Sequence, residues 1–465
     1  MAAPDDLVTL AEMEDRERMS RISQAWDAYY GKAPQPLKVR RGETTNDNVR
    51  INLAREIVDT GVAKLFGKHF EVTAPQDMPD DTPNDVQDAI DATIRCSGGG
   101  LLWMRFGLSG AIGGTMFYRL SPQDDGTVRI VVLDPQNVNV EWDPDDFQTI
   151  TKWLITWNTL DQGLGVARRQ VIEPDGDQWT VTEQELVVIN AKTSQTAWVT
   201  TEVTDWPHVY PPVGYAQNIP SPHEVYGISD IEPDTLQLIA SIERVASNIN
   251  RTIRLYAHPR TWGKSIGDAL NMDANIGSVL KFESPDASLN NLEMSSDLSS
   301  SINFYNQLVG ALRETVRVPD VAAGKLDSTA PLSGVALQIL YAPLVEKTEA
   351  KQETYGAAII EMIRRALDLQ GFGETTLCTL GWQEIIPADP LAERQTAVLD
   401  KGLGVSKKTL MAKLGYDPDA EAEQTAIESA ASQVASTRAM NAGQLGGPSD
   451  AAVAAYDSSD RSAPA

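Results

Sequence analysis

Two long amphipathic segments on either side of a short insert constrain the fold of this chain more than any other feature of its sequence. The segment 229–257 opens with Ser229 and Glu232 at the spacing of a helix capping box. A second segment, 296–316, repeats apolar residues three and four positions apart. The insert, 259–293, has strand-like pieces and turns but is too small for a core of its own. The pattern predicts two long helices with a small tip between them.

Each of these helices carries a stripe of apolar side chains along one side. The stripes consist of Ile231, Leu238, Ile242, Val245, Ile249, Ile253 and Tyr256 in the first helix, and of Leu298, Ile302, Tyr305, Val309, Leu312 and Val316 in the second. The opposite side of the first helix is a polar face with Arg244, Asn248 and Arg251. Such stripes far more often form the core of a globular helical bundle than serve a specific function. The pattern by itself therefore favours a globular bundle.

The remaining sequence divides by the period of its apolar residues. Helical spacing is found at about 1–32 and 51–67, and a helical region at 85–114 is interrupted by three glycines. From 115 to 210, short β-branched and aromatic runs alternate with Pro, Asp and Gly, which predicts strands in hairpins and meanders. Helix returns near 229 and dominates thereafter. The fold class is therefore predicted to be α+β.

The net charge of the chain limits how tightly it can bind nucleic acid. The 65 acidic residues outnumber the 39 basic ones, which gives a formal net charge of −26. A protein that grips DNA needs clustered Lys and Arg. Either this chain never meets DNA, or it meets DNA without holding it tightly.

Targeting and redox features of the sequence are plain. The acidic N-terminus lacks the apolar stretch of a signal peptide, and no run of 18 apolar residues predicts a membrane span. Cys96 and Cys378 have no Cys or His neighbour at ligand spacing, so reduced structural thiols are expected.

The sequence offers no recognisable catalytic constellation, so no enzymatic activity, cofactor or metal is expected. Gly263, Lys264 and Ser265 lack the earlier glycine that a phosphate-binding loop requires, because His258 occupies its place. The four histidines are scattered, and Ser109 and Ser333 each precede a glycine but lack the context of a nucleophile elbow.

In their order along the chain, several segments resemble the portal, or head-to-tail connector, proteins of tailed bacteriophages. The resemblance covers about residues 20–430. It rests on "AWDAYYGKAPQP", "VRINLAREIVDTGVAKLFGKHFEV", "GAIGGTMFYRL", "VVLDPQNVNVEWDP", "YGISDIEPDTLQLIASIERVASNINRTIRLYAHPRTWGKS", "VPDVAAGKLDSTAPLSGVALQILYAPLVEKTEAKQ" and "GWQEIIPADPLAERQTAVLDKGLGVSKKTLMAKLGYDPDAEAEQ".

The resemblance implies the domains of the phage portal fold. They are a wing at 1–225, stem helix 1 at 226–258, a small α/β clip at 259–293, stem helix 2 at 294–317, a tunnel loop at 318–333, a long kinked helix and wing strand at 334–386, and a helical crown at 387–435. The tail at 436–465 is small, polar and breaker-rich, and is predicted to be disordered.

The resemblance also assigns candidate site residues. The tunnel loop, which faces the DNA channel, comprises Gly324, Lys325, Asp327, Ser328, Thr329, Pro331 and Leu332, followed by a helix kink at Pro343. The clip, which contacts terminase or an adaptor, contributes Arg260, Trp262, Lys264, Asp268 and Lys281. Arg244, Asn248 and Arg251 form the polar face of the stem.

For function, the resemblance implies a ring of twelve copies at one capsid vertex of a virion, assembled in the host cytoplasm. Double-stranded DNA would pass through its channel with weak, non-specific contacts, inward during packaging and outward during ejection. Terminase large subunit, a head-completion or adaptor protein, and the major capsid and scaffolding proteins are the implied partners, and no membrane is involved. The alternatives are another head–tail adaptor ring, a phage nuclease or NTPase with an unrecognised site, and a globular acidic binding protein.

Overall fold

The computed structural model describes most of the chain. The described residues are 4–38, 46–67, 70–75, 82–161, 164–190, 195–257, 261–264, 286, 288–291, 298–320, 322, 334–373, 376–382, 384–386, 390–418 and 420–429. They fall into two compact units, which meet in sequence between Ile386 and Pro387.

Seven helices of the first unit are described. They are α1 (Pro4–Tyr29), α2 (Leu53–Leu65), α3 (Thr82–Cys96), α4 (Leu101–Gly113), α5 (Pro233–Ala257), α6 (Ser299–Val316) and α7 (Gly334–Leu369), with a short 3-10 helix at Pro135–Asn137. The second unit contains α8 (Pro390–Gly402) and α9 (Lys407–Lys413), and it is helical again over residues 420–429. In the described part of the chain, no helix is both long and apolar enough to cross a membrane.

The described strands of the first unit form four antiparallel sheets. The largest has the order β4-β5-β6-β7-β8, built from Val138–Asp143, Asp146–Asp161, Leu164–Asp175, Gln178–Asn190 and Gln195–Trp206. A second has the order β3-β2-β9, built from Val128–Leu133, Thr115–Pro122 and Val213–Gln217. The other two pair β1 (Glu71–Thr73) with β12 (Thr379–Gly381), and β10 (Thr261–Lys264) with β11 (Ser288–Asn291).

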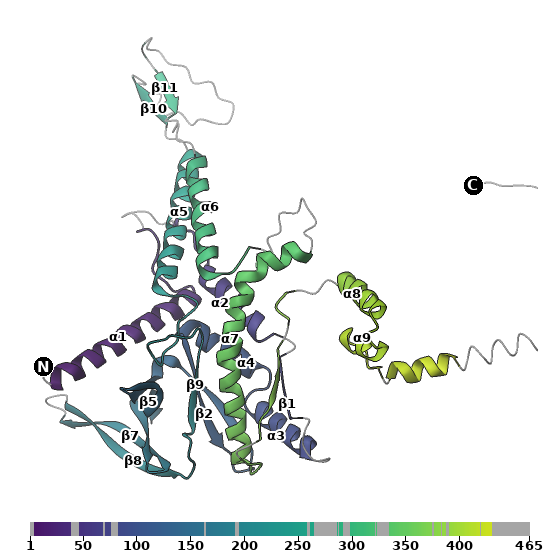
Figure 1. Ribbon diagram of the computed structural model, residues 1–465. Coiled ribbons are helices and arrows are strands. Elements are labelled where there is room, and N and C mark those ends of the chain that lie inside the picture. The colour runs from purple at the N-terminus through teal and green to yellow at the C-terminus, as the bar shows by residue number, and fades with distance from the viewer. Residues whose placement is uncertain are drawn as a thin grey trace, which may run out of the picture. The chain divides into compact units, whose positions relative to one another are not determined.

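Three apolar clusters hold the first unit together. One joins α3, α4 and the β3-β2-β9 sheet to the C-terminal half of α7, with Phe106 and Ile359 fully buried. A second joins α1, α2, α5 and α6 to α7 around Val58 and Ile242. The third fills the space between β2 and the large sheet around Phe117 and Ile172. Because α7 belongs to the first two clusters, it connects the strand-rich part to the base of α5 and α6 (Figure 1).

The α+β prediction is confirmed, and the predicted elements lie close to their expected places. The three glycines at 98–100 separate α3 from α4, and Gly98 and Gly99 have positive φ of 109° and 63°, which favours glycine. Strands β1 and β9 were not predicted from the sequence, because both are short. In addition, β1 lies next to a segment rich in Pro and Asp, which indicates a connection and not a strand.

The start of α5 differs from the capping-box expectation. Glu232 accepts a hydrogen bond from the Ser229 backbone N–H at 2.8 Å, but the helix begins only at Pro233. The hydroxyl of Ser229 donates to the last carbonyls of α4, those of Ala111 and Ile112, both at 2.9 Å. Ser229 is therefore used to attach this turn to α4, and the helix starts one turn later than predicted.

Candidate functional site: the stalk and the bent helix

Helices α5 and α6 lie side by side and form a stalk (Figure 1). At its base the apolar stripes are buried, as for Ile242 and Leu312. Toward the end that leads to β10, the stripe residues Ile253 and Ile302 are 49% and 46% exposed, and Phe304, which lies outside the stripe of α6, is 51% exposed. One copy of the chain therefore covers its stripes at the base of the stalk and leaves them open farther out.

The residues on the polar face of α5 differ in exposure, because the chain segment 46–52 packs against part of this helix. Arg244 and Asn248 are exposed, whereas Arg251 is partly buried and forms an ion pair with Asp47 at 3.5 Å between Nε and Oδ2. Asp47 is buried and also pairs with Arg254. The sequence predicts Arg251 on one polar face with Arg244 and Asn248, and it gives no sign of Asp47, which lies about two hundred positions earlier in the chain.

The crossing segment runs over residues 46–52 and is fixed to α5 by hydrogen bonds. The Val49 N–H donates to the Ser247 hydroxyl at 3.0 Å, and the Ile51 N–H donates to the Glu243 carboxylate at 3.1 Å. Burial raises the pKa of Glu243, and the Ile51 N–H and the Arg50 guanidinium act in the opposite direction. This part of the stalk is covered within one chain.

The base of α6 is clamped to α2 by a buried arginine. The Arg313 guanidinium lies 2.5 Å from Glu56 and 3.3 Å from Asp320, with 5% of its side chain exposed. Paired on both sides, this cation fixes the end of α6 to the body of the unit.

The insert between α5 and α6 contains the two-stranded sheet of β10 and β11. Trp262 pairs with Asn290 and Lys264 with Ser288 in antiparallel register. Lys264 is exposed. Of the predicted clip residues, Arg260, Asp268 and Lys281 lie outside the described residues.

Helix α7 contains Pro343, in the interior of the helix as predicted. Figure 1 shows that the N-terminal part of α7 turns away from the rest of the helix. Before and at the bend, Tyr341 and Leu344 are buried, whereas Ile339 is 70% exposed and Leu340 is 40% exposed. All seven predicted tunnel-loop residues, 324–332, lie outside the described residues.

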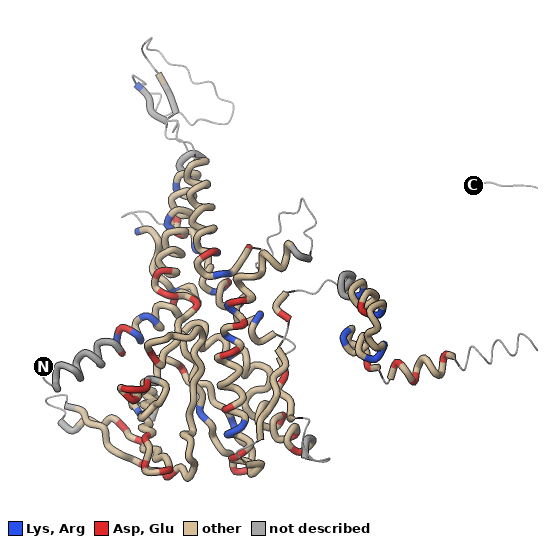
Figure 2. Tube along the Cα trace, viewed as in Figure 1, with Lys and Arg blue, Asp and Glu red and all other residues tan. Residues whose placement is uncertain are grey.

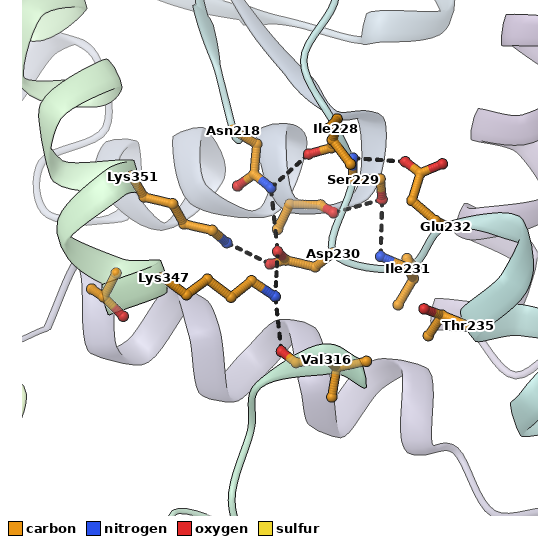
Figure 3. Close-up of polar contacts among 12 residues, drawn as sticks. Asn218, Ile228, Ser229, Asp230, Ile231, Glu232, Thr235, Val316, Lys347 and Lys351 are labelled. Atoms are coloured by element: carbon orange, nitrogen blue, oxygen red, sulfur yellow. Dashed lines mark hydrogen bonds and ion pairs between the residues drawn. The ribbon is translucent and has the colours of Figure 1, made fainter. Parts of the chain in front are cut away.

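One turn after the proline, α7 takes part in a buried polar cluster that the sequence analysis missed (Figure 3). Asp230 accepts from Lys351 Nζ at 2.6 Å and lies 3.0 Å from Lys347 Nζ. Lys347 also donates to the Val316 carbonyl at the end of α6, at 3.1 Å. Asn218 completes the set by donating to Asp230 at 3.3 Å. We call Asp230, Lys347, Lys351 and Asn218 the Asp230 joint.

Charged residues of both signs occur throughout the described residues, with a group of acidic ones, Glu141, Asp143, Asp145 and Asp146, around the turn between β4 and β5. Figure 2 shows acidic and basic residues interspersed along the described parts of α5 and α7, whereas α6 carries charge only near its C-terminal end. Across the same described part of the chain, no group of three or more His, Cys, Asp or Glu side chains is placed to hold a metal ion.

Comparison with known proteins places the chain in a family. A model of the family described as "Phage portal protein, SPP1 Gp6-like" matches residues 12–435. No curated protein sequence matches the chain.

Among solved structures, a chain from the virion of a native gene transfer agent particle is 12% identical with a TM-score of 0.48, and the match covers 85% of this chain and 99% of that one. A chain from the neck of an empty gene transfer agent particle is 12% identical with a TM-score of 0.49, over 79% of this chain and 90% of that one. From the family match over nearly its whole length, the chain belongs to the SPP1 Gp6-like phage portal proteins.

Proposed function

We propose that this portal protein forms a ring of twelve copies at one vertex of a viral capsid. The observation that carries the proposal is the family match over residues 12–435, and the half-exposed Ile253, Ile302 and Phe304 of the stalk support it. Ile302 and Phe304 are two positions apart on α6 and therefore face different sides of the helix, so each can be covered by a different neighbour in a ring. In the ring, stalks of neighbouring copies would cover one another there.

The size of such a ring suits the passage of duplex DNA. Twelve helices packed side by side at the usual helix separation give a circumference of roughly 110 Å and a circle of axes about 35 Å wide. Side chains would narrow the bore to somewhat less than about 30 Å. A duplex passes through an opening of this width, inward during packaging and outward during ejection.

The elements of the chain fit the parts of a portal subunit as follows. Helices α5 and α6 are the two stem helices, and β10 and β11 belong to the clip, where terminase and later a head-completion protein dock. Residues 318–333 form the tunnel loop ahead of the bent α7. Residues 387–435 form the crown, and 1–225 form the wing. Capsid and scaffolding proteins are the remaining partners.

The charge of the chain suits a channel through which DNA slides. With a formal charge of −26 per copy, a ring repels phosphate and does not clamp the duplex. The portal is therefore a passive channel, and terminase supplies the work that moves the DNA.

End-on views of purified particles by negative-stain microscopy, with native mass spectrometry, test the proposal. We expect rings with a central opening and a mass equal to twelve copies, formed by the chain alone or after addition of scaffolding and capsid proteins. Compact particles without an opening under both conditions would contradict it. A closed ring of another copy number would contradict only the number twelve.

A further inference from the structure

The Asp230 joint brings together parts of the chain that are far apart in sequence. Asp230 lies in the turn before α5, and its own N–H donates to the Ala111 carbonyl at the end of α4, at 2.8 Å. Lys347 and Lys351 come from α7, and the Val316 carbonyl comes from the end of α6. Four helices therefore meet at a single carboxylate and its partners.

The Asp230 joint contains two positive charges and one negative charge, and each of the three groups has a partner. Two ammonium groups share one carboxylate, and the exposed fractions of the side chains are 1% for Asp230, 3% for Lys351 and 11% for Lys347. The Val316 carbonyl takes up part of the excess, because the end of a helix carries partial negative charge that favours a cation. Lys347 consequently serves two partners: it pairs with Asp230 and caps α6.

The surroundings of the joint contain few other charged groups. Tyr355 of α7 approaches from one side, with its hydroxyl 3.4 Å from the Asn218 side-chain oxygen. Gly61 of α2 faces Asp230 and Lys351 without a side chain of its own. A cavity of about 270 Å³ beside Lys347 is also lined by Glu232, Asp234 and Arg317.

The Asp230 joint lies next to the point at which α7 is easiest to bend. Lys347 is one turn after Pro343, and Lys351 is two turns after it. Proline removes one backbone hydrogen bond of the helix and so makes this point the easiest one to bend. The joint fixes α7 on one side of that point, directly to the end of α6. On the other side lies the arm of α7, residues 334–342, where Ile339 and Leu340 are exposed.

We propose that the Asp230 joint couples the arm of α7 to the base of the stalk, with Lys347 as the connecting residue. A change in the bend at Pro343 shifts the backbone of the next turn, which carries Lys347, and thereby loosens or tightens the end of α6, and the reverse holds by reciprocity. The coupling operates within one subunit, so it stands or falls independently of ring formation. Lys347 acts here as a positioning residue.

A double-mutant cycle on the full chain tests this inference. Pro343→Ala restores the missing N–H and so changes the arm, and hydrogen exchange reports on the end of α6, residues 313–318. With Lys347 present, we expect Pro343→Ala to change these exchange rates at least about fivefold. In the Lys347→Met background, where Asp230 and Lys351 remain a balanced pair, the same substitution should change them less than about twofold.

A neighbour on the same turn provides the control. Glu346 is exposed, so Glu346→Gln should leave the full effect of Pro343→Ala in place. If Lys347→Met does not fold, as judged by loss of a cooperative thermal transition, Lys347→Gln takes its place, because its shorter amide cannot bridge both partners. Equal effects of Pro343→Ala with and without Lys347, or no effect in either background, would overturn the inference.

Discussion

Gly110 of α4 lies against Tyr355 of α7 so closely that a Cβ on the glycine would overlap the phenol hydroxyl. Tyr355 is fully buried, and burial raises the pKa of its hydroxyl well above the usual value, with the Asp230 carboxylate adding to the effect. The contact sets how near α4 and α7 can approach. It also holds the tyrosine beside the Asp230 joint.

The first prediction concerns this contact. Gly110→Ala should lower the free energy of unfolding by about 1–3 kcal/mol, because the added methyl group forces the packed tyrosine to move. Urea denaturation followed by circular dichroism measures the change. Gly100, at the start of the same helix, has φ of −59° and open space around it, so Gly100→Ala should cost little or nothing. Similar losses for both variants would contradict the role of the close contact.

The second prediction concerns pH. Burial lowers the pKa of Lys351 to about 8, Asp230 opposes this, and Lys347 adds to it. The unfolded chain keeps the ordinary value of 10.5, so between these values the unfolded state binds more protons and stability rises with pH. The free energy of unfolding of the wild type, minus that of Lys351→Met, should therefore rise by of order 3 kcal/mol from pH 7 to pH 10.

Matched denaturation series at the two pH values measure this difference. Lysines remote from the Asp230 joint have the same surroundings in both proteins, so their contributions cancel. Lys32 is exposed, so Lys32→Met should show no such divergence from the wild type. Parallel pH profiles for wild type and Lys351→Met would show that Lys351 does not titrate in this range.

The third prediction concerns the outer part of the stalk. Ile302→Glu and Phe304→Glu place charge on α6 where the single chain leaves these side chains half exposed. Because burying an unpaired carboxylate between copies is costly, ring particles should be lost while the helical circular dichroism signal persists. Gln307 is exposed on the same helix, and Gln307→Glu serves to separate a general charge effect from loss of apolar contact. Undiminished rings in both apolar variants would exclude this part of α6 from the interface.

The fourth prediction concerns DNA. A chain with 65 acidic and 39 basic residues should bind duplex DNA only weakly, with a dissociation constant above about 1 µM at physiological salt, and more weakly as salt increases. Fluorescence anisotropy with a short labelled duplex measures this. Nanomolar binding by rings under these conditions would argue against a sliding conduit.

Much of the fold follows from local sequence signals. The spacing of the stripes predicts α5 and α6, and the structure places Pro343 inside α7, where the sequence predicts a kink. Burial along the stripes could not be foreseen, because Ile242 and Ile253 carry the same side chain on the same side of one helix. Their difference comes from α1 and α2, which pack only against the base.

The Asp230 joint shows the limit of sequence reasoning more sharply. Lys347 and Lys351 are four residues apart on one helix, which by itself indicates an exposed basic face. Their carboxylate partner lies more than a hundred positions away in an irregular turn, and no periodicity connects the two. The only local sign is their place among buried residues such as Leu344 and Tyr355. Asp47 escaped notice for the same reason.

The paired strands β10 and β11 have a consequence for how this protein can diversify. They connect to the rest of the chain through α5 and α6 and form their backbone pairs with each other. An exchange of both strands together therefore leaves the backbone pairing of the other three described sheets unchanged. A chimera carrying a foreign insert at this point should keep the melting temperature of its parent.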